Sequence, residues 1–167
     1  MAAIGIGSDP AITLAPSLST KFTGDASSAG AIASAFGVGA GLGFLAIPLI
    51  RRIIRLNHQG LAGLLLMAGG FSALIVANEF LAALVAFLAA GLGMTLSLTS
   101  LSAQLQLRIP DELRGRIMAL WGVAFIGSRP LAAAVNGAVA DLGSASMALV
   151  LVVFTLICAA LLLVVRL

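Results

Sequence analysis

Long apolar stretches, separated by short polar segments, set the pattern of this chain. Four of them contain no Lys, Arg, Asp or Glu, and a fifth is interrupted only by Arg129. Each reaches roughly the 20 residues that an α-helix needs to cross a hydrocarbon core of about 30 Å. They do not alternate apolar and polar residues as barrel strands do, so they predict helices. The stretches are residues 26–50, 57–78, 80–107, 117–140 and 142–165.

The predicted fold is an all-α polytopic membrane bundle, with about five full transmembrane helices and a partial one at the N-terminus. The apolar start of the chain, residues 1–18, is too short and too broken for a full span, so we expect a partial helix ending near Pro16. A polar outer loop follows over residues 19–28, and a single bundle occupies residues 29–167. The full helices are expected at residues 29–50, 60–77, 80–107, 117–140 and 147–165.

The composition agrees with a membrane protein. The 167 residues are 61% hydrophobic and 9% charged, whereas soluble domains are typically about 45–50% apolar and about 25% charged. A small soluble domain leaves much of its surface in water and could not hide so many apolar side chains. The 19 glycines are normal in membrane helices, where small residues let backbones approach. The net charge of +3 comes from scattered basic residues without a basic stripe, so we expect no nucleic-acid partner.

No catalytic or metal-binding group can be assembled from these residues. The single cysteine, Cys158, lies within an apolar run, and the single histidine, His58, lies in a basic segment. Neither is accompanied by a Ser/His/Asp set, a pair of carboxylates or a cluster with metal-ligand spacing. We therefore expect that the protein is not an enzyme and binds no metal or cofactor.

Basic residues gather on one side of the predicted bundle. The segments on that side carry Arg51, Arg52, Arg55, Arg108, Arg114, Arg116 and Arg166. The other side has Lys21 alone, together with the acidic Asp25, Glu79 and Asp141. The positive-inside rule makes the arginine-rich side, which includes the C-terminus, cytoplasmic. We therefore expect a multi-pass protein of the cell (inner or plasma) membrane.

The helix expected at residues 80–107 contains the most polar stretch inside a predicted span. Four of its residues recur at steps of four, three and four, so they share one helix face. Such a face either lines a substrate pathway or forms hydrogen bonds to neighbouring helices, and both alternatives stay open. The four candidate pathway residues are Thr95, Thr99, Ser102 and Gln106.

Arg129 lies about twelve residues into the helix expected at 117–140, close to mid-membrane. A charge there costs at least about 2.5–3.5 kcal/mol, so it should face the bundle interior or water. Asn136 follows on the same face, and both residues are candidates for the substrate pathway. Arg129 could bind an anionic solute or a carboxylate, although we expect no acidic residue of this chain at matching depth. A partner in another segment, or snorkelling, would also explain it, and Pro130 could break the helix and open a water-filled gap.

Two further features concern helix packing and the cytoplasmic loops. Glycines at positions 37, 39, 41 and 43 form two small-xxx-small pairs, which favour close helix packing over a dinucleotide-binding loop. The basic loops could hold anionic lipid headgroups, gate a cytoplasmic mouth or only fix the topology. In the second loop, Pro110 should open a helix with acidic residues in its first turn. The candidate gating residues are Arg51, Arg52, Arg55, Asp111, Glu112, Arg114 and Arg116.

The second of these loops and its surroundings resemble a known family. Residues 104–127, QLQLRIPDELRGRIMALWGVAFIG, closely resemble the major facilitator superfamily, and more narrowly its branch of enterobactin exporters and drug efflux proteins. Residues 34–55, SAFGVGAGLGFLAIPLIRRIIR, resemble the eighth helix of that superfamily and the basic loop after it. The resemblance covers nearly the whole chain from about residue 28. It departs from the branch at Arg129, where the branch is usually apolar or small.

The resemblance implies that the five full helices correspond to family helices eight to twelve, and residues 1–18 to the tail of the seventh. It also implies that helices 29–50, 80–107 and 117–140 line a central cavity, while 60–77 and 147–165 face lipid. The last of these has almost nothing polar, so we expect it to be the most lipid-exposed helix. The chain then represents the C-terminal half of a twelve-helix transporter whose substrate binds between two halves.

The implied function is export of a small molecule, a drug or a siderophore, by alternating access, driven by proton exchange. Only Glu79 and Asp141 stand out as titratable residues for such coupling, and both lie at the outer ends of helices. The expected partners are the lipid bilayer, the substrate, and either a separately encoded first half or a second copy of the chain. The alternative is a non-transporting membrane subunit or the product of a truncated gene.

Overall fold

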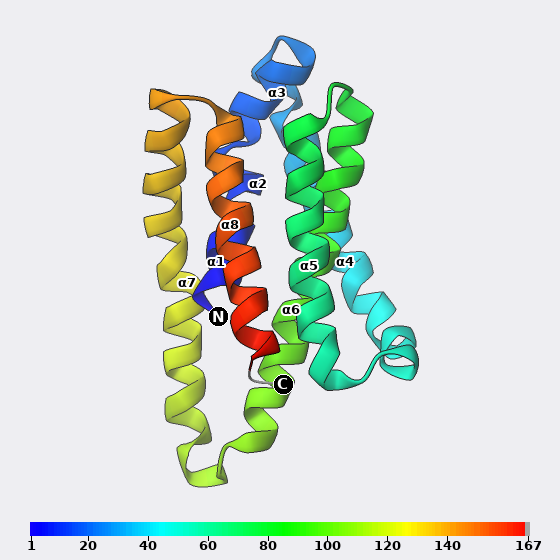
Figure 1. Ribbon diagram of the computed structural model, residues 1–167, viewed down its shortest axis with the longest axis vertical. Coiled ribbons are helices and arrows are strands. Elements are labelled where there is room, and N and C mark those ends of the chain that lie inside the picture. The colour runs from blue at the N-terminus through cyan, green and yellow to red at the C-terminus, as the bar shows by residue number, and fades with distance from the viewer. Residues whose placement is uncertain (166–167) are drawn as a thin grey trace.

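The computed structural model describes residues 1–165, and within that range every regular element is a helix (Figure 1). Five helices of the described chain are long and apolar enough to cross a membrane, which confirms the predicted bundle. Consecutive long helices run in opposite directions (Figure 1). They are α4 (Ala29–Ile53), α5 (Leu56–Val76), α6 (Phe80–Arg108), α7 (Asp111–Leu142) and α8 (Ala145–Val164). Arg166, counted above among the cytoplasmic charges, lies outside the described residues.

The N-terminal segment is a broken helix in three pieces, α1 (Ala2–Ser8), α2 (Pro10–Thr13) and α3 (Ala15–Thr23). The first break falls just before Pro10, which has no backbone N–H to continue the helical ladder. Pro16 lies in the first turn of α3, where a missing N–H costs little, so it helps to start a helix instead of ending one. The helical segment therefore extends past residue 18 and stops at Gly24, which has a φ of 75°.

The loops between the long helices are shorter than the polar segments in the sequence suggest. The expected loop at residues 51–59 shrinks to Ile54 and Arg55, and that at residues 108–116 shrinks to Ile109 and Pro110. Arginine is a good helix former, so charged residues at a membrane surface need not end a helix. Pro110 does end one, because it holds the residue before it in an extended conformation (φ −98°, ψ 132°).

The prediction that Pro130 breaks its helix is wrong. The helix α7 continues through Pro130 from Asp111 to Leu142. Membrane helices tolerate an internal proline because small local adjustments satisfy the freed backbone carbonyl. The predicted start of α7 is confirmed in one respect, since Pro110 precedes the helix and Asp111 and Glu112 lie in its first turn.

The centre of the bundle is the packing of α6 against α5 and α4. Phe71 of α5 and Phe87 of α6 are both fully buried, and their rings meet edge to face with centroids 6.0 Å apart. The backbones of α4 and α6 touch at Gly39 and at Gly91, where a side chain would collide with the opposing helix. Close packing is therefore confirmed for Gly39, whereas Gly37 faces open space.

Burial differs strongly among the five long helices. About half of the most apolar window of α5 and of α6 is buried, against 28% for α8, 17% for α4 and 6% for α7. Within this chain α8 is more buried than α4 and α7, because its Leu149, Val152 and Leu156 lie in the core, and that it is the helix most exposed to lipid stays a prediction. Hydropathy measures how apolar a side chain is, and it does not tell lipid contact from helix contact.

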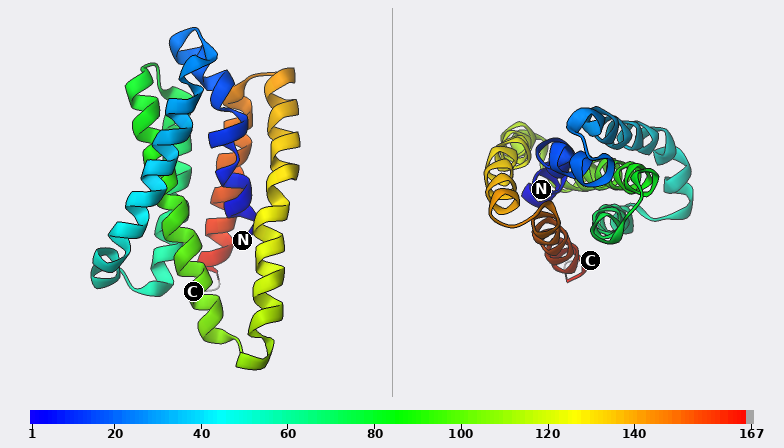
Figure 2. Two further views of the ribbon diagram at one scale, coloured as in Figure 1. Left: turned by 180° about the vertical axis from the view of Figure 1, so that it is seen from behind. Right: turned by 90° about the horizontal axis from the view of Figure 1, so that it is seen from above.

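The uncovered helices lie on one side of the bundle. The left view of Figure 2 shows the molecule from behind. The face turned toward the viewer there is formed by α4, the α1 to α3 segment and α7, and the helices α5 and α8 lie on the opposite side. The α1 piece packs against α7, α8 and α6, so the N-terminal segment sits between the two exposed helices. The least buried helices thus flank the broken one.

Candidate functional site

The polar residues of α6 divide between contacts to different helices. Thr95 is buried and donates its hydroxyl to the carbonyl oxygen of Ala40 in α4, at 2.9 Å. Thr99 and Ser102 are half-buried and donate to carbonyls of their own helix, those of Thr95 and Leu98. Thr95 is thus part of the helix interface, whereas Thr99 and Ser102 remain partly accessible.

A second set of polar contacts joins α6 to α5, and it was not predicted from the sequence. Gln104 donates from Nε2 to the carbonyl of Leu56 at 2.8 Å, and Ser100 donates to Oε1 of Gln59 at 3.2 Å. Gln59 is 2% exposed and also donates to the carbonyl of Ile54 at 2.7 Å. These bonds hold the short connection between α4 and α5 against the inner half of α6. Their signal in the sequence was the glutamine at residue 59, inside what we expected to be a loop.

Arg129 lies half-buried on α7, at the end of a column of aromatic side chains. The rings of Trp121 and Phe125 stack with centroids 5.7 Å apart, and the Arg129 guanidinium lies 6.0 Å from the Phe125 ring centre. The three residues are spaced four apart, so they follow one face of the helix. A guanidinium over an aromatic ring at this distance is held by cation–π attraction. The stacked rings hold the Arg129 guanidinium at one position along α7, and they leave its positive charge in place.

Asn136 is 3% exposed, and its partner is a residue that the sequence analysis passed over. Its Nδ2 donates to Oδ2 of Asp9 at 2.7 Å, across the contact between the N-terminal segment and α7. The other oxygen of Asp9 accepts the hydroxyl of Thr13 at 2.8 Å, and Asp9 itself is 5% exposed.

The structure adds the buried Asp9 to the two titratable residues expected for proton coupling, Glu79 and Asp141. Both are exposed at helix ends, at the N-cap of α6 and near the end of α7, whereas Asp9 is buried inside the bundle. The sequence shows Asp9 only as part of an Asp–Pro pair in the apolar start of the chain, which we described as too broken for a full span. Its burial could not be predicted because its partner lies far away along the chain, in α7.

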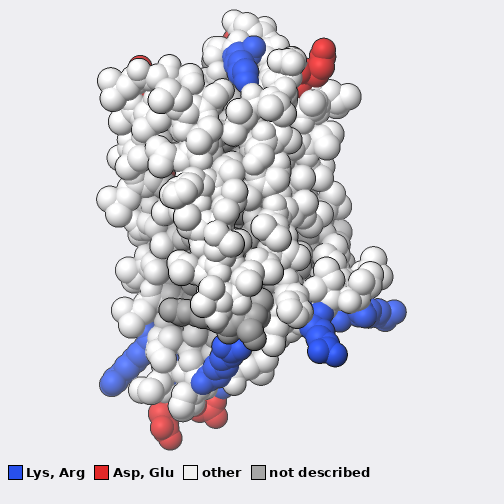
Figure 3. Space-filling view, viewed as in Figure 1, with Lys and Arg blue, Asp and Glu red and all other residues white. Residues whose placement is uncertain are grey.

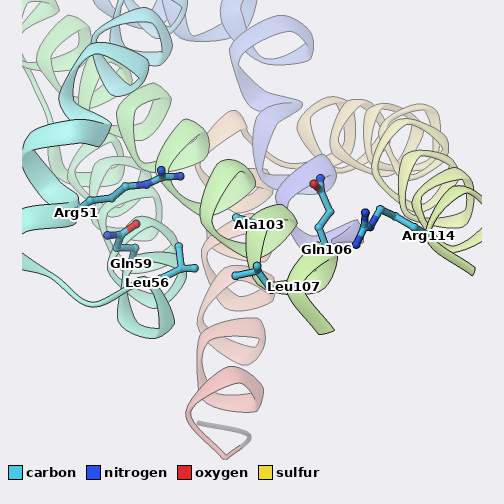
Figure 4. Close-up of a pocket in the computed structure, with 7 residues that line it drawn as sticks. All are labelled: Arg51, Leu56, Gln59, Ala103, Gln106, Leu107 and Arg114. Atoms are coloured by element: carbon cyan, nitrogen blue, oxygen red, sulfur yellow. The ribbon is translucent and has the colours of Figure 1, made fainter. Parts of the chain in front are cut away.

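A cavity of about 600 Å³ opens at the end of the bundle where α4 meets α5 and α6 meets α7 (Figure 4). Figure 4 shows Arg51 and Arg114 on opposite sides of it, with Gln106 near Arg114. Arg114 forms an ion pair with Asp111, with Nη2 2.5 Å from Oδ1. The remaining candidate gating residues, Arg52, Arg55, Glu112 and Arg116, are exposed and do not line this cavity.

Charged side chains gather at the two ends of the molecule, and most of the basic ones lie at the end that carries the cavity (Figure 3). The connections from α4 to α5 and from α6 to α7 both lie at that end (Figure 1). The arginine-rich segments therefore share one side of the bundle, as predicted from the sequence. The wide band between the two ends shows almost no charged side chain on the face drawn (Figure 3). This is the surface expected of a protein that crosses a bilayer several times.

Comparison with known proteins identifies the family. Neither a curated protein nor a solved structure matches the chain. The family model described as transmembrane secretion effector matches residues 2–167, so it covers the broken N-terminal helix as well as the five long ones. The match agrees with the apolar helices and with the resemblance found in residues 104–127. The chain belongs to the transmembrane secretion effector family of the major facilitator transporters, and it is a multi-pass membrane protein.

Proposed function

We propose that this chain forms the C-terminal half of a secondary transporter and that the whole transporter exports a small molecule by alternating access. The observation that carries the proposal is the uncovered face made of α4 and α7, which flank the largely buried α1 and α2 pieces. Polar groups on such a face are unfavourable against lipid tails, so another helical unit or a water-filled path should cover it. In many secondary transporters, two related halves enclose the substrate between them.

The helix correspondence follows from that proposal. The helices α4 to α8 take the places of family helices eight to twelve, and α1 to α3 take the place of the seventh. The closeness of α4 to α6, and of α1 to α7, supports a unit in which segments far apart along the chain pack together. The partner is a first half encoded separately or linked to this chain, or else a second copy.

The proposed substrate pathway follows the accessible polar groups of α6 and α7. Thr99 and Ser102 are half-buried and Gln106 is exposed, whereas Thr95 contributes through the packing of α4. On α7, Arg129 supplies a positive charge above an aromatic ring, a combination that suits planar or anionic solutes. Drugs and siderophores both include molecules of this kind.

The proposed inner mouth is the cavity between Arg51 and Arg114. Two guanidinium groups from different helices at one opening would attract anions and would separate or approach as the helices move. We place this mouth, and the C-terminus, on the cytoplasmic side, because the positive-inside rule assigns the arginine-rich end there. The membrane is accordingly the plasma (inner) membrane.

The test is efflux from cells that express the complete transporter, with fluorescent drugs and iron-loaded siderophores as the probe panel. Replacing Arg129 with Ala should lower efflux at least tenfold while the amount of protein in the membrane stays constant. The control is Leu161→Ala, because Leu161 is an apolar residue of α8, away from the uncovered face, that is 61% exposed. Arg129→Lys should recover only part of the activity, since lysine keeps the charge but not the planar stacking group.

Equal efflux from wild type and Arg129→Ala would remove Arg129 from the pathway. Absence of efflux for the whole panel, with stable protein in the membrane, would favour the alternative of a non-transporting membrane subunit. The product of a truncated gene would instead be degraded when expressed at its natural level. A pulse-chase measurement of the chain in its own cells separates these two outcomes.

A further inference from the structure

Asp9 stands apart from the other acidic residues of this protein. The chain has six Asp and Glu residues, and among them only Asp9 is buried. It occupies the break between α1 and α2, immediately before Pro10. Its partner Asn136 lies six residues before the end of α7 at Leu142, which places the pair about 9 Å inside that end. Burying a charged carboxylate at such a depth costs free energy, and acidic residues placed there usually serve proton or ion pathways.

Both carboxylate oxygens of Asp9 have hydrogen-bond donors, and each donor comes from a different element. Thr13 of α2 donates to Oδ1, and Asn136 of α7 donates to Oδ2. In the part of the chain that the structure describes, the one ion pair is Arg114 with Asp111, so Asp9 has no cationic partner there. Hydrogen bonds alone stabilise the charge of the Asp9 carboxylate. A neutral carboxylic acid at this position would therefore leave no unpaired cation beside it.

The ionisable groups on the elements packed around α1 and α2 do not contact Asp9. The nearest along the chain are the Met1 amino group at the start of α1 and Lys21 in α3. The others on these elements are Arg51 and Arg52 of α4, Arg108 of α6, Cys158 of α8, and Asp111, Glu112, Arg114, Arg116, Arg129 and Asp141 of α7. Along α7, Asp141 is five residues from Asn136 and Arg129 is seven. Asp141 is exposed, and the guanidinium of Arg129 lies over the Phe125 ring.

The amide of Asn136 suits both protonation states of Asp9. With Asp9 charged, Nδ2 donates to the carboxylate, as the structure shows. With a proton on Oδ2, the carboxylic acid becomes a donor, and a half-turn of the Asn136 amide presents Oδ1 as its acceptor. The reaction is the binding of one proton to one carboxylate, with no other bond changed. A cavity of about 320 Å³ borders Asn136, and hydroxyls of Ser128 and Thr155 on its wall could hold a water that delivers the proton.

We propose that Asp9 is a proton-binding site and that Asn136 is its positioning residue. The site deepens the transport function proposed above, on which its coupling role rests, since Asp9 would carry the exchanged proton. A charge-assisted hydrogen bond is about twice as strong as a neutral one. Proton binding therefore loosens the contact between the broken N-terminal helix and α7. Protonation would thus bias movement of the N-terminal segment relative to α7.

The first experiment is infrared difference spectroscopy of the purified chain in lipid nanodiscs as a function of pH. The expected result is a carbonyl band of a protonated carboxylic acid that disappears as the pH rises. The band should be absent in Asp9→Asn, a variant of the same size, and unchanged in Glu79→Gln, an exposed control. Absence of the band in wild type, or its persistence in Asp9→Asn, would overturn the proposal.

A second variant tests the positioning role. In Asn136→Leu the protonated acid loses its hydrogen-bond acceptor, so the carbonyl frequency of its band should differ from that of wild type. A band at the wild-type frequency would show that Asn136 does not position the carboxylate. Circular dichroism confirms that each variant keeps its helical content.

The transport arm of the experiment distinguishes this proposal from the proposed function. Efflux by the complete transporter should respond to an imposed pH gradient in wild type and should lose that response in Asp9→Asn. A titrating band without any efflux would retain the proton site and reject the transport function. Efflux whose pH response is the same in Asp9→Asn and wild type would reject the coupling role of Asp9.

Discussion

The α-carbon of Gly39 faces the carbonyl oxygen of Leu88 so closely that a Cβ added to Gly39 would lie 2.0 Å from that oxygen. The backbones of α4 and α6 are therefore in direct contact at this point. Gly91 makes the reciprocal contact, since its added Cβ would lie 2.1 Å from the carbonyl oxygen of Phe36. Small residues at such crossings let membrane helices gain dispersion contacts and weak hydrogen bonds between backbones.

We expect Gly39→Ala to destabilise the bundle by about 1–3 kcal/mol, because the methyl group forces α4 and α6 apart. The matched control is Gly37→Ala, since nothing lies within 4 Å of a Cβ at Gly37. That change should be neutral or stabilising by up to about 1 kcal/mol through helix propensity. Steric trapping in bicelles measures the unfolding free energy of each variant. Equal effects of the two substitutions would contradict the α4–α6 contact.

Thr95 and Thr99 make a second matched pair, which differs in where the hydroxyl donates. Thr95 bonds to Ala40 in α4, whereas Thr99 bonds to carbonyls of its own helix. Thr95→Val should cost about 0.6 kcal/mol and at most about 1.7 kcal/mol, the range for hydrogen bonds between membrane helices. Thr99→Val should leave the unfolding free energy nearly unchanged. The same measurement would contradict the assignment if Thr99→Val were the more destabilising.

The topology predicts which positions a membrane-impermeant thiol reagent can reach from each side. In a Cys158→Ala background, cysteine at His58 should react only from the cytoplasmic side and cysteine at Lys21 only from outside. Both residues are exposed, at the start of α5 and near the end of α3. Labelling of intact cells and of inverted vesicles separates the two sides. Reaction of the His58→Cys variant in intact cells would reverse the orientation.

The turn between α3 and α4 has a pH-sensitive cap. Hydrogen bonds from Ser27, from its hydroxyl and then from its backbone N–H, hold the pKa of Asp25 below its usual value. These hydrogen bonds stabilise the charged form of Asp25. The cap therefore stabilises the turn fully at pH values above the ordinary pKa of Asp, and this stabilisation is lost as the pH falls through the lowered pKa of Asp25. Ser27→Ala should move the pKa of Asp25 part of the way up, because the backbone donor remains.

Carboxyl carbon NMR of selectively labelled protein follows that titration directly. Ser28→Ala is the control, since Ser28 lies next to Ser27 and does not contribute to the lowered pKa of Asp25. A pKa of Asp25 that is the same in Ser27→Ala and in wild type would show that the hydroxyl does not contribute.

Most of the fold could be predicted from the sequence, because membrane spans follow from apolar length alone. The five full helices were found, with ends that differ from the predicted ones mainly where arginines continue a helix into the surface, as at Arg51 and Arg52. Proline was the least reliable signal. It ends α6 at Pro110, starts α3 at Pro16 and leaves α7 continuous at Pro130. The effect of a proline depends on its position in the helix, which a single sequence does not reveal.

The candidate site was predicted less completely. Spacing placed Thr95 and Thr99 on one face of α6, but it could not show that Thr95 is enclosed by α4. The burial of Asp9 depends on Asn136, and the distance between them along the chain hides the pair from any local pattern. Sequence periodicity reports one helix at a time, whereas these interactions arise where two helices meet.

The pairing of Asp9 with Asn136 has a consequence for how the protein is made. The two residues are 127 positions apart. At about 5–20 residues per second, the ribosome reaches Asn136 some 6–25 s after Asp9. During that interval Thr13, four residues away, is the partner that the nascent segment itself can supply. The segment that carries Asp9 is therefore synthesised well before the helix whose Asn136 completes the enclosure of its carboxylate.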